Sequence, residues 1–219
     1  RELYKHLAGR VNVTVATGHT NRLLVVGYNA ENTTTQNCQP SSVTYNGTAM
    51  TLAARDVAIN PAPNYDCVGL YYLLNPTTGT RAVVVNMGGQ QEDGLVGGAV
   101  SLYNVYQAAP DVTATSQSAG LTSTTVATTW PNQLVIDAIG PGDVLGTMAV
   151  GSGQTQRVLR DSSAAAGSDS LGMSTFMSSG AGNRTMSWTR SPAPNRSAQA
   201  VAVWQSVDDT APTHSISLG

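Results

Sequence analysis

The sequence predicts an all-β protein, an antiparallel β-sandwich of the jelly-roll or immunoglobulin-like kind with extended arms at both ends. About a dozen short segments alternate apolar with polar residues, and turn residues separate them at close spacing. No segment of twelve residues keeps a helical 3.6-residue period between helix caps. We therefore expect one domain over residues 11–207, an N-terminal arm over residues 1–10 and a C-terminal segment over residues 208–219.

The first half carries the clearest strand signals. Residues 11–16 (VNVTVA) alternate strictly, and residues 22–29 (RLLVVGYN) form a mostly apolar run that suits a central strand. Asn46-Gly47 separates two alternating runs, which is the strongest short-range signal for a hairpin with a type I′ turn. Further strands are expected at residues 68–74, 80–87 and 97–105.

The second half repeats this style. Strands are expected at residues 123–129, 133–140, 154–159, 171–177, 184–189 and 198–207. The low-complexity stretches 162–170 and 191–197 lie between these strands and are interpreted as loops within one domain.

The charge content points to an exported protein. Only 11% of the residues are charged and Lys5 is the single lysine, whereas an ordinary soluble domain has roughly 25% charged residues. A surface built from Thr, Ser, Asn and Gln suits a glycosylated or subunit-covered exterior, and Arg1 at the first position is what removal of an export signal would leave. The net charge of -2 provides no footprint for nucleic acid, and no stretch reaches the roughly 18 apolar residues that span a membrane.

The two cysteines, Cys38 and Cys67, lie in separate loop-like stretches with polar neighbours. In an exported protein this predicts a disulfide, which would stabilise the fold by roughly 3.6 kcal/mol through loop closure. Two unrelated buried thiols fit these neighbours less well, and there is no CxxC spacing for redox or metal chemistry.

Several of these segments together resemble a known family. The phrases TNRLLVVGYN, SVTYNGTAMT, GLYYLLNPTTGTRAVVVNM and GGAVSLYNV resemble a β-sandwich domain that recurs in large secreted bacterial surface proteins, and NQLVIDAIG, GNRTMSWT and AQAVAVWQ extend the likeness over residues 11–207. The resemblance implies a secreted antiparallel sandwich that often occurs as a repeated module, and it transfers no catalytic signature. In type, though not in motif, the chain also resembles the small subunits of donor-strand extracellular fibrils.

No pattern in the sequence indicates catalysis. His6, His19 and His214 lie far apart, without the spacing of metal ligands, and there is no GxSxG, phosphate-binding or dinucleotide motif. We expect no enzyme activity, no catalytic or metal site and no cofactor, with a hydrolase as a remote alternative. Glu92-Asp93 and Asp208-Asp209 are weak candidates for calcium ligands, and Asp137 is the one acid inside a strand run.

Trp130 lies in a loop-like stretch and is the best candidate for an exposed ring that could stack on a sugar, whereas Trp188 and Trp204 suit the core. Five sequons occur, with Asn32 and Asn195 the preferred glycan carriers because both lie in loops; the other three are Asn183, Asn46 and Asn12. Asn46 has a competing role in the hairpin turn.

Both ends of the chain alternate like strands, although the sandwich needs neither. Because sheet edges expose unpaired backbone groups, we expect an arm to complete the edge of a neighbouring copy. The predicted interface residues are Leu3, Leu7, Val11, Val13, Val15, Ile216 and Leu218, with the N-terminal arm slightly preferred as donor. Head-to-tail contacts of this kind build a helical homopolymer, so the predicted function is the subunit of an extracellular filament. Arms folded back on their own domain, a helical turn at residues 1–7 and a carbohydrate-binding or adhesive module remain as alternatives.

Overall fold

The computed structural model describes residues 8–32, 38–59, 65–89, 94–142, 146–161 and 169–207. All regular structure in these ranges is β-strand, and every strand pair is antiparallel. The predicted all-β class and the antiparallel sandwich are therefore confirmed.

Seventeen strands are found in the described ranges. The first half contains β1 (Ala8–Val15), β2 (Leu23–Asn32), β3 (Ser42–Tyr45), β4 (Thr48–Ala49), β5 (Thr51–Ile59), β6 (Tyr65–Leu74), β7 (Gly79–Asn86) and β8 (Gly94–Leu102). The second half contains β9 (Val112–Ser118), β10 (Thr124–Thr128), β11 (Leu134–Pro141), β12 (Thr147–Val150), β13 (Thr155–Asp161), β14 (Ser170–Met177), β15 (Gly182–Met186), β16 (Trp188–Ser191) and β17 (Ser197–Trp204).

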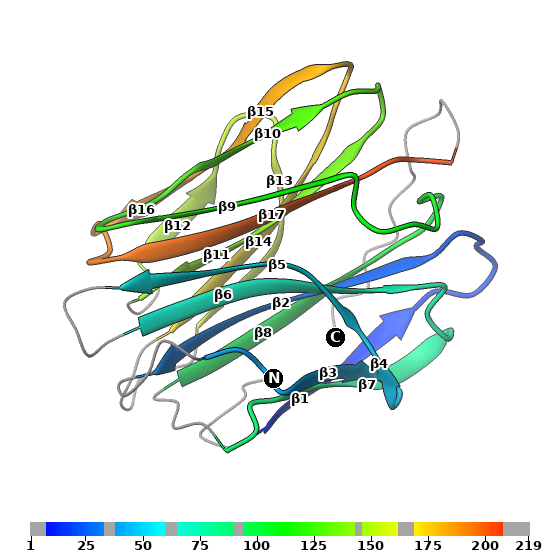
Figure 1. Cartoon of the computed structure of the whole chain (residues 1–219), viewed down its shortest axis with the longest axis horizontal. Helices are drawn as coiled ribbons and strands as arrows, with labels where there is room; N and C mark the ends of the chain where they lie inside the picture. Colours follow the sequence, from blue (N-terminus) through cyan, green and yellow to red (C-terminus); the bar gives the residue numbers. More distant parts are fainter. Residues whose placement is uncertain are drawn as a thin grey trace.

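The strands form stacked layers (Figure 1). The first inner sheet has the order β5-β6-β2-β8, and the second inner sheet has the order β13-β14-β11-β17-β9. A first outer sheet, β1-β7-β3-β4, covers the free face of the first inner sheet. Two outer ribbons, β10-β15 and β12-β16, cover the second inner sheet.

The two halves of the chain share one strand-pairing pattern. In the first half β2 pairs with β6 and β8, while β1 and β3 both pair with β7. In the second half β11 pairs with β14 and β17, while β10 pairs with β15 and β12 pairs with β16. The single predicted domain is thus a stack of two sandwiches of the same topology.

A shared core joins the halves. Apolar side chains of the two inner sheets meet there, among them Leu23, Leu70, Ile136 and Trp204, which are all fully buried. The inner sheets carry glycines where the facing side chain comes closest: a Cβ at Gly98 would lie 2.6 Å from a methyl of Val158. Burying apolar area at about 25 cal/mol per Å² is the main force that holds such layers together.

The sequence predicted the positions of most strands, but not all of their first and last residues. Asn46 and Gly47 adopt φ angles of 50° and 79° between β3 and β4, which confirms the predicted type I′ hairpin turn. Strands β9 and β12 had no separate prediction, and residues 184–189, expected as one strand, divide between β15 and β16. The predicted N-terminal arm, residues 1–10, extends too far, because β1 already begins at Ala8.

No helix in the described part of the chain is long and apolar enough to cross a membrane.

Candidate functional site

The predicted disulfide is confirmed. Cys38 and Cys67 are bonded, with their Cα atoms 5.7 Å apart, and both are buried in the core between the first outer and first inner sheets. Cys67 lies on β6, opposite Ala30 of β2 and Val57 of β5. The bond ties the segment before β3 to the middle of the first inner sheet. Such a bond is typical of proteins from an oxidising compartment.

The predicted interface residues fall into two groups. Leu3, Leu7, Ile216 and Leu218 lie outside the described residues. Val11, Val13 and Val15 lie on β1, which pairs with β7 of the same chain, and the side chains of Val13 and Val15 are buried in that chain's own core. Their burial is therefore explained within one chain, because the alternation of β1 directs these three valines towards the first inner sheet. This corrects the prediction that Val11, Val13 and Val15 contact a neighbouring subunit.

The sheet edges differ in how they are protected. β5 carries Arg55, Asp56 and a bulge, and β13 carries Arg157, Arg160 and a bulge, which are the usual guards of an edge. The edge strand β8 is uncharged, but none of its side chains is exposed. β9 (VTATSQS) has no charge, no proline and no bulge along its pairing with β17, and every second side chain is exposed. Of these four edges of the inner sheets, β9 is the one most open to a further strand.

The sequons differ in accessibility. Asn12, Asn46, Asn183 and Asn195 are exposed, so each has room for a glycan. Asn32, one of the two preferred carriers, is 0% exposed at the end of β2. A sugar cannot be attached to an amide that the fold encloses, so the Asn32 prediction is wrong for the folded chain.

The tryptophans have the exposure that the sequence predicted. Trp188 and Trp204 are buried, whereas Trp130 is 57% exposed in the loop between β10 and β11. Tyr106, in the segment between β8 and β9, is also 57% exposed. These two rings are the largest exposed aromatic side chains in the described part of the chain. His19 stacks on Tyr103, with ring centroids 3.8 Å apart.

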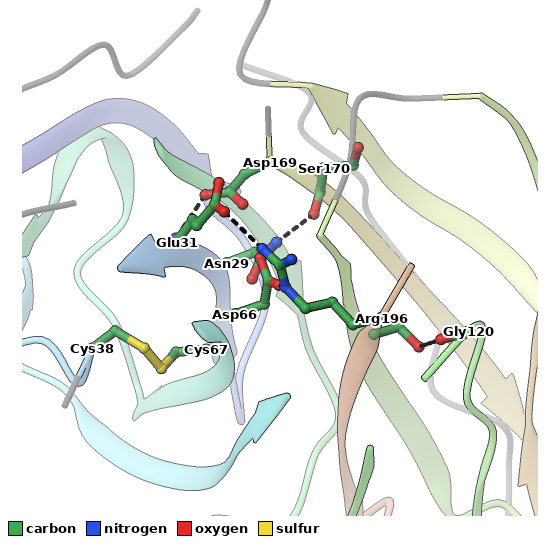
Figure 2. A network of polar contacts seen from close by, with 10 residues as sticks. Asn29, Glu31, Cys38, Asp66, Cys67, Gly120, Asp169, Ser170 and Arg196 are labelled. Carbon is green, nitrogen blue, oxygen red and sulfur yellow. Dashed lines mark hydrogen bonds and ion pairs between the residues drawn. A yellow bond between two sulfur atoms is a disulfide. The ribbon is translucent and has the colours of Figure 1, made fainter. Parts of the chain in front are cut away.

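A buried polar cluster, which the sequence did not reveal, lies between the two inner sheets (Figure 2). Glu31 of β2 and Asp66 of β6 are directly opposite each other in the sheet register, and both make ion pairs with Arg196, which precedes β17. Arg196 Nη2 is 2.7 Å from Glu31 Oε1. Asp169, just before β14, accepts a hydrogen bond of 2.8 Å from the backbone N–H of Glu31. We call these four residues the acidic cluster.

The acidic cluster is enclosed. Asp66 and Asp169 are 0% exposed, and Glu31 and Arg196 are also buried. Asn29, two residues before Glu31 on β2, donates a 2.9 Å hydrogen bond from Nδ2 to the Ser170 carbonyl. The acids that meet here are far apart along the chain: Glu31 and Asp66 are separated by 35 residues, and Glu31 and Asp169 by 138. No local spacing could have identified them.

A second buried carboxylate lies on the opposite face of the second inner sheet, on the side of Trp188 and β16. Asp137 of β11 accepts hydrogen bonds from Ser174 N (2.9 Å), Ser174 Oγ (2.5 Å), Trp188 Nε1 (2.7 Å) and Gln199 Nε2 (2.7 Å). Burial raises the pKa of the Asp137 carboxyl above its usual value, although these hydrogen bonds act in the opposite direction. With all its partners on neighbouring strands, Asp137 has the arrangement of a structural crosslink.

No family model, no curated protein and no solved structure matches this chain. The fold and the described residues define its class as an antiparallel β-sandwich protein with a disulfide and two buried carboxylate networks.

Proposed function

We propose that the chain is the structural subunit of an extracellular filament, in which neighbouring subunits join head-to-tail by exchange of a β-strand. The observation that carries the proposal is the open edge of β9, an uncharged strand that is hydrogen-bonded to β17 on one side only. An edge of this kind is the usual acceptor for an added strand. The donor is residues 208–219, whose alternating Ile216 and Leu218 suit strand addition.

The C-terminal segment is the better donor because β1 already uses the N-terminal candidate. Residues 8–15 pair along their whole length with β7 of the same chain, so transfer of β1 to a neighbour would break a strand pair and expose Val13 and Val15. This reverses the preference taken from the sequence. Burying two aliphatic side chains of a donor contributes about 1.5–3 kcal/mol each before the cost of ordering the segment.

The surface and the disulfide support an extracellular place for such a filament. The disulfide is stable in an oxidising compartment. Four of the five sequons are exposed and can carry glycans that cover a surface with few charges. Copies of the chain itself are then the main partner.

Negative-stain electron microscopy and light scattering of three proteins test the proposal. The full chain is expected to form filaments, whereas the chain without residues 208–219 and the variant Thr115→Lys on β9 are expected to remain folded monomers. Gln156→Lys is the matched control, because it adds the same charge to the already charged edge β13. Filaments of Thr115→Lys equal to those of the full chain would exclude β9 as the acceptor. A full chain that stays monomeric at high concentration would exclude the filament.

A carbohydrate-binding or adhesive module is the second candidate, favoured by the exposure of Trp130 and Tyr106. Exposed aromatic rings bind sugars by stacking on their apolar faces. Pull-down on insoluble polysaccharides distinguishes the candidates: retention of a monomeric chain that is lost in Trp130→Ala supports the binding module.

A further inference from the structure

We propose that the acidic cluster is a calcium-binding site, with Glu31, Asp66 and Asp169 as carboxylate ligands and Asn29 as an amide ligand. This inference does not depend on the proposed filament. Three carboxylates and one guanidinium meet in these four buried side chains, so acids outnumber bases within the cluster. Buried charge of one sign is costly unless it is paired, and one divalent cation would neutralise it.

The distances between the carboxylates suit one shared ion. One ligand oxygen from each of Glu31, Asp66 and Asp169 lies within 4.8 Å of the other two. Calcium binds oxygen at about 2.3–2.6 Å, so two ligands of the same ion are at most about 4.6–5.2 Å apart. The three carboxylate oxygens are therefore spaced about as the ligands of one calcium ion are.

Asn29 provides evidence that is independent of the acids. Its side chain is 0% exposed and lies beside Asp66 and Arg196 in Figure 2. Its Nδ2 donates to Ser170, but its Oδ1 has no hydrogen-bond partner among the described residues. A buried acceptor without a donor costs about 1–3 kcal/mol, and a bound cation would satisfy it.

The backbone at the end of β11 lies close against the cluster. Gly140 and Gly142 at the end of β11 face the cluster, where a Cβ at Gly140 would clash with the Asn29 amide and one at Gly142 would clash with Asp66 and Arg196. Two glycines two residues apart thus keep side-chain atoms out of the space next to Asn29 and Asp66. Glycines at these positions let the Asn29, Asp66 and Arg196 side chains lie directly against the backbone at the end of β11.

The chemistry favours calcium over other metals. The candidate ligands are all oxygen atoms, whereas zinc and other transition metals prefer nitrogen or sulfur. Magnesium demands an octahedral arrangement at about 2.0–2.1 Å and retains several waters, which a site fixed by three strands does not easily accommodate. Bound calcium would link β2 and β6 of the first inner sheet to the start of β14 in the second, and so would hold the two halves together.

Thermal unfolding of the full chain tests the site. After dialysis against EGTA, addition of CaCl2 is expected to raise Tm by about 5–10 °C at a calcium concentration of 100 times Kd, and equal MgCl2 is expected to have a smaller effect. Isothermal titration calorimetry should give one calcium ion per chain. In Asp169→Asn and Asp66→Asn the calcium affinity should fall at least about 10-fold, since each loses a charged ligand. Asp111→Asn, an exposed acid at the other end of β17, should leave it unchanged.

Three results would overturn the proposal. A wild-type chain without a calcium-dependent Tm shift or calorimetric signal has no site, and this outcome does not depend on any variant folding. Equal affinity in wild type, Asp66→Asn and Asp169→Asn would place the ion elsewhere, for which Glu92→Gln with Asp93→Asn is the first check. The third result is a Tm that is higher in Asp169→Asn than in wild type, both treated with EGTA, and that calcium does not change in either protein. This result would show that a proton, and not a calcium ion, balances the charge of the cluster.

Discussion

Replacement of Asp137 by alanine tests whether this buried carboxylate holds the second half together. Asp137 is at the centre of the second inner sheet, between β14 and β17, and accepts four hydrogen bonds from Ser174, Trp188 and Gln199. In Asp137→Ala the acceptor is lost while its donors remain buried. The change therefore removes contacts to β14, β16 and β17 at once.

The expected loss follows from these contacts. Each buried donor without a partner costs about 1–3 kcal/mol, and the Trp188 indole N–H, the Gln199 amide and the Ser174 backbone N–H are all affected. Relief from burying the carboxylate offsets part of this cost. We expect a net loss of about 3–5 kcal/mol in the free energy of unfolding, and a smaller loss of about 2 kcal/mol in Asp137→Asn, which retains one oxygen acceptor.

Urea unfolding at pH 7, followed by tryptophan fluorescence and by circular dichroism, measures this change. Coincident transitions and an unchanged m-value would show that the variant still unfolds in one cooperative step. A loss below about 1 kcal/mol in Asp137→Ala with an unchanged m-value would refute the reasoning. It would mean that the four hydrogen bonds contribute no more than the cost of burying the charge.

Three further predictions concern stability. Because burial raises the pKa of Asp137, the folded chain keeps this proton at pH values where the unfolded chain, with a pKa of about 3.9, has released it. The stabilisation by this group is present below about pH 3.9 and is lost as the pH rises through the folded pKa. The unfolding free energy of wild type minus that of Asp137→Asn should therefore fall from about pH 4 upwards, and a difference that rises would contradict the direction of the pKa shift. Tyr28→Phe should stabilise the chain by about 1 kcal/mol, because the buried Tyr28 hydroxyl has no hydrogen-bond partner in the described part of the chain; a lower Tm would reveal a partner. Replacement of both Cys38 and Cys67 by alanine should cost roughly 3.6 kcal/mol in urea unfolding, the loop-closure value for their separation of 29 residues, and an unchanged midpoint would show that the crosslink constrains little.

Local pattern predicted the elements that depend on local physics. The alternation of residues 11–16 gave β1, because side chains of a strand point to opposite faces in turn, and Asn46-Gly47 gave its turn, because these residues tolerate positive φ. It failed for β9, whose VTATSQS is too polar to stand out from a loop, although pairing with β17 makes it a strand.

The candidate sites depended on contacts that sequence spacing does not contain. Cys38 and Cys67 could be paired because the chain has only two cysteines. Asn32 looked like a loop residue, yet β2 extends to include it and encloses its amide, so its glycan prediction failed. Strand periodicity cannot show where a strand ends when the flanking residues are polar.

The sequence by itself determined that the chain is an all-β sandwich with a disulfide and few charges, since alternation, turn residues and composition are properties of short segments. Only the tertiary structure decided that two sandwiches of one topology stack through a shared core. It also decided that Glu31, Asp66, Asp169 and Arg196 meet there. The physical reason is the antiparallel register: it brings residues far apart along the chain to within one side chain's reach, and no local pattern encodes which strands become neighbours.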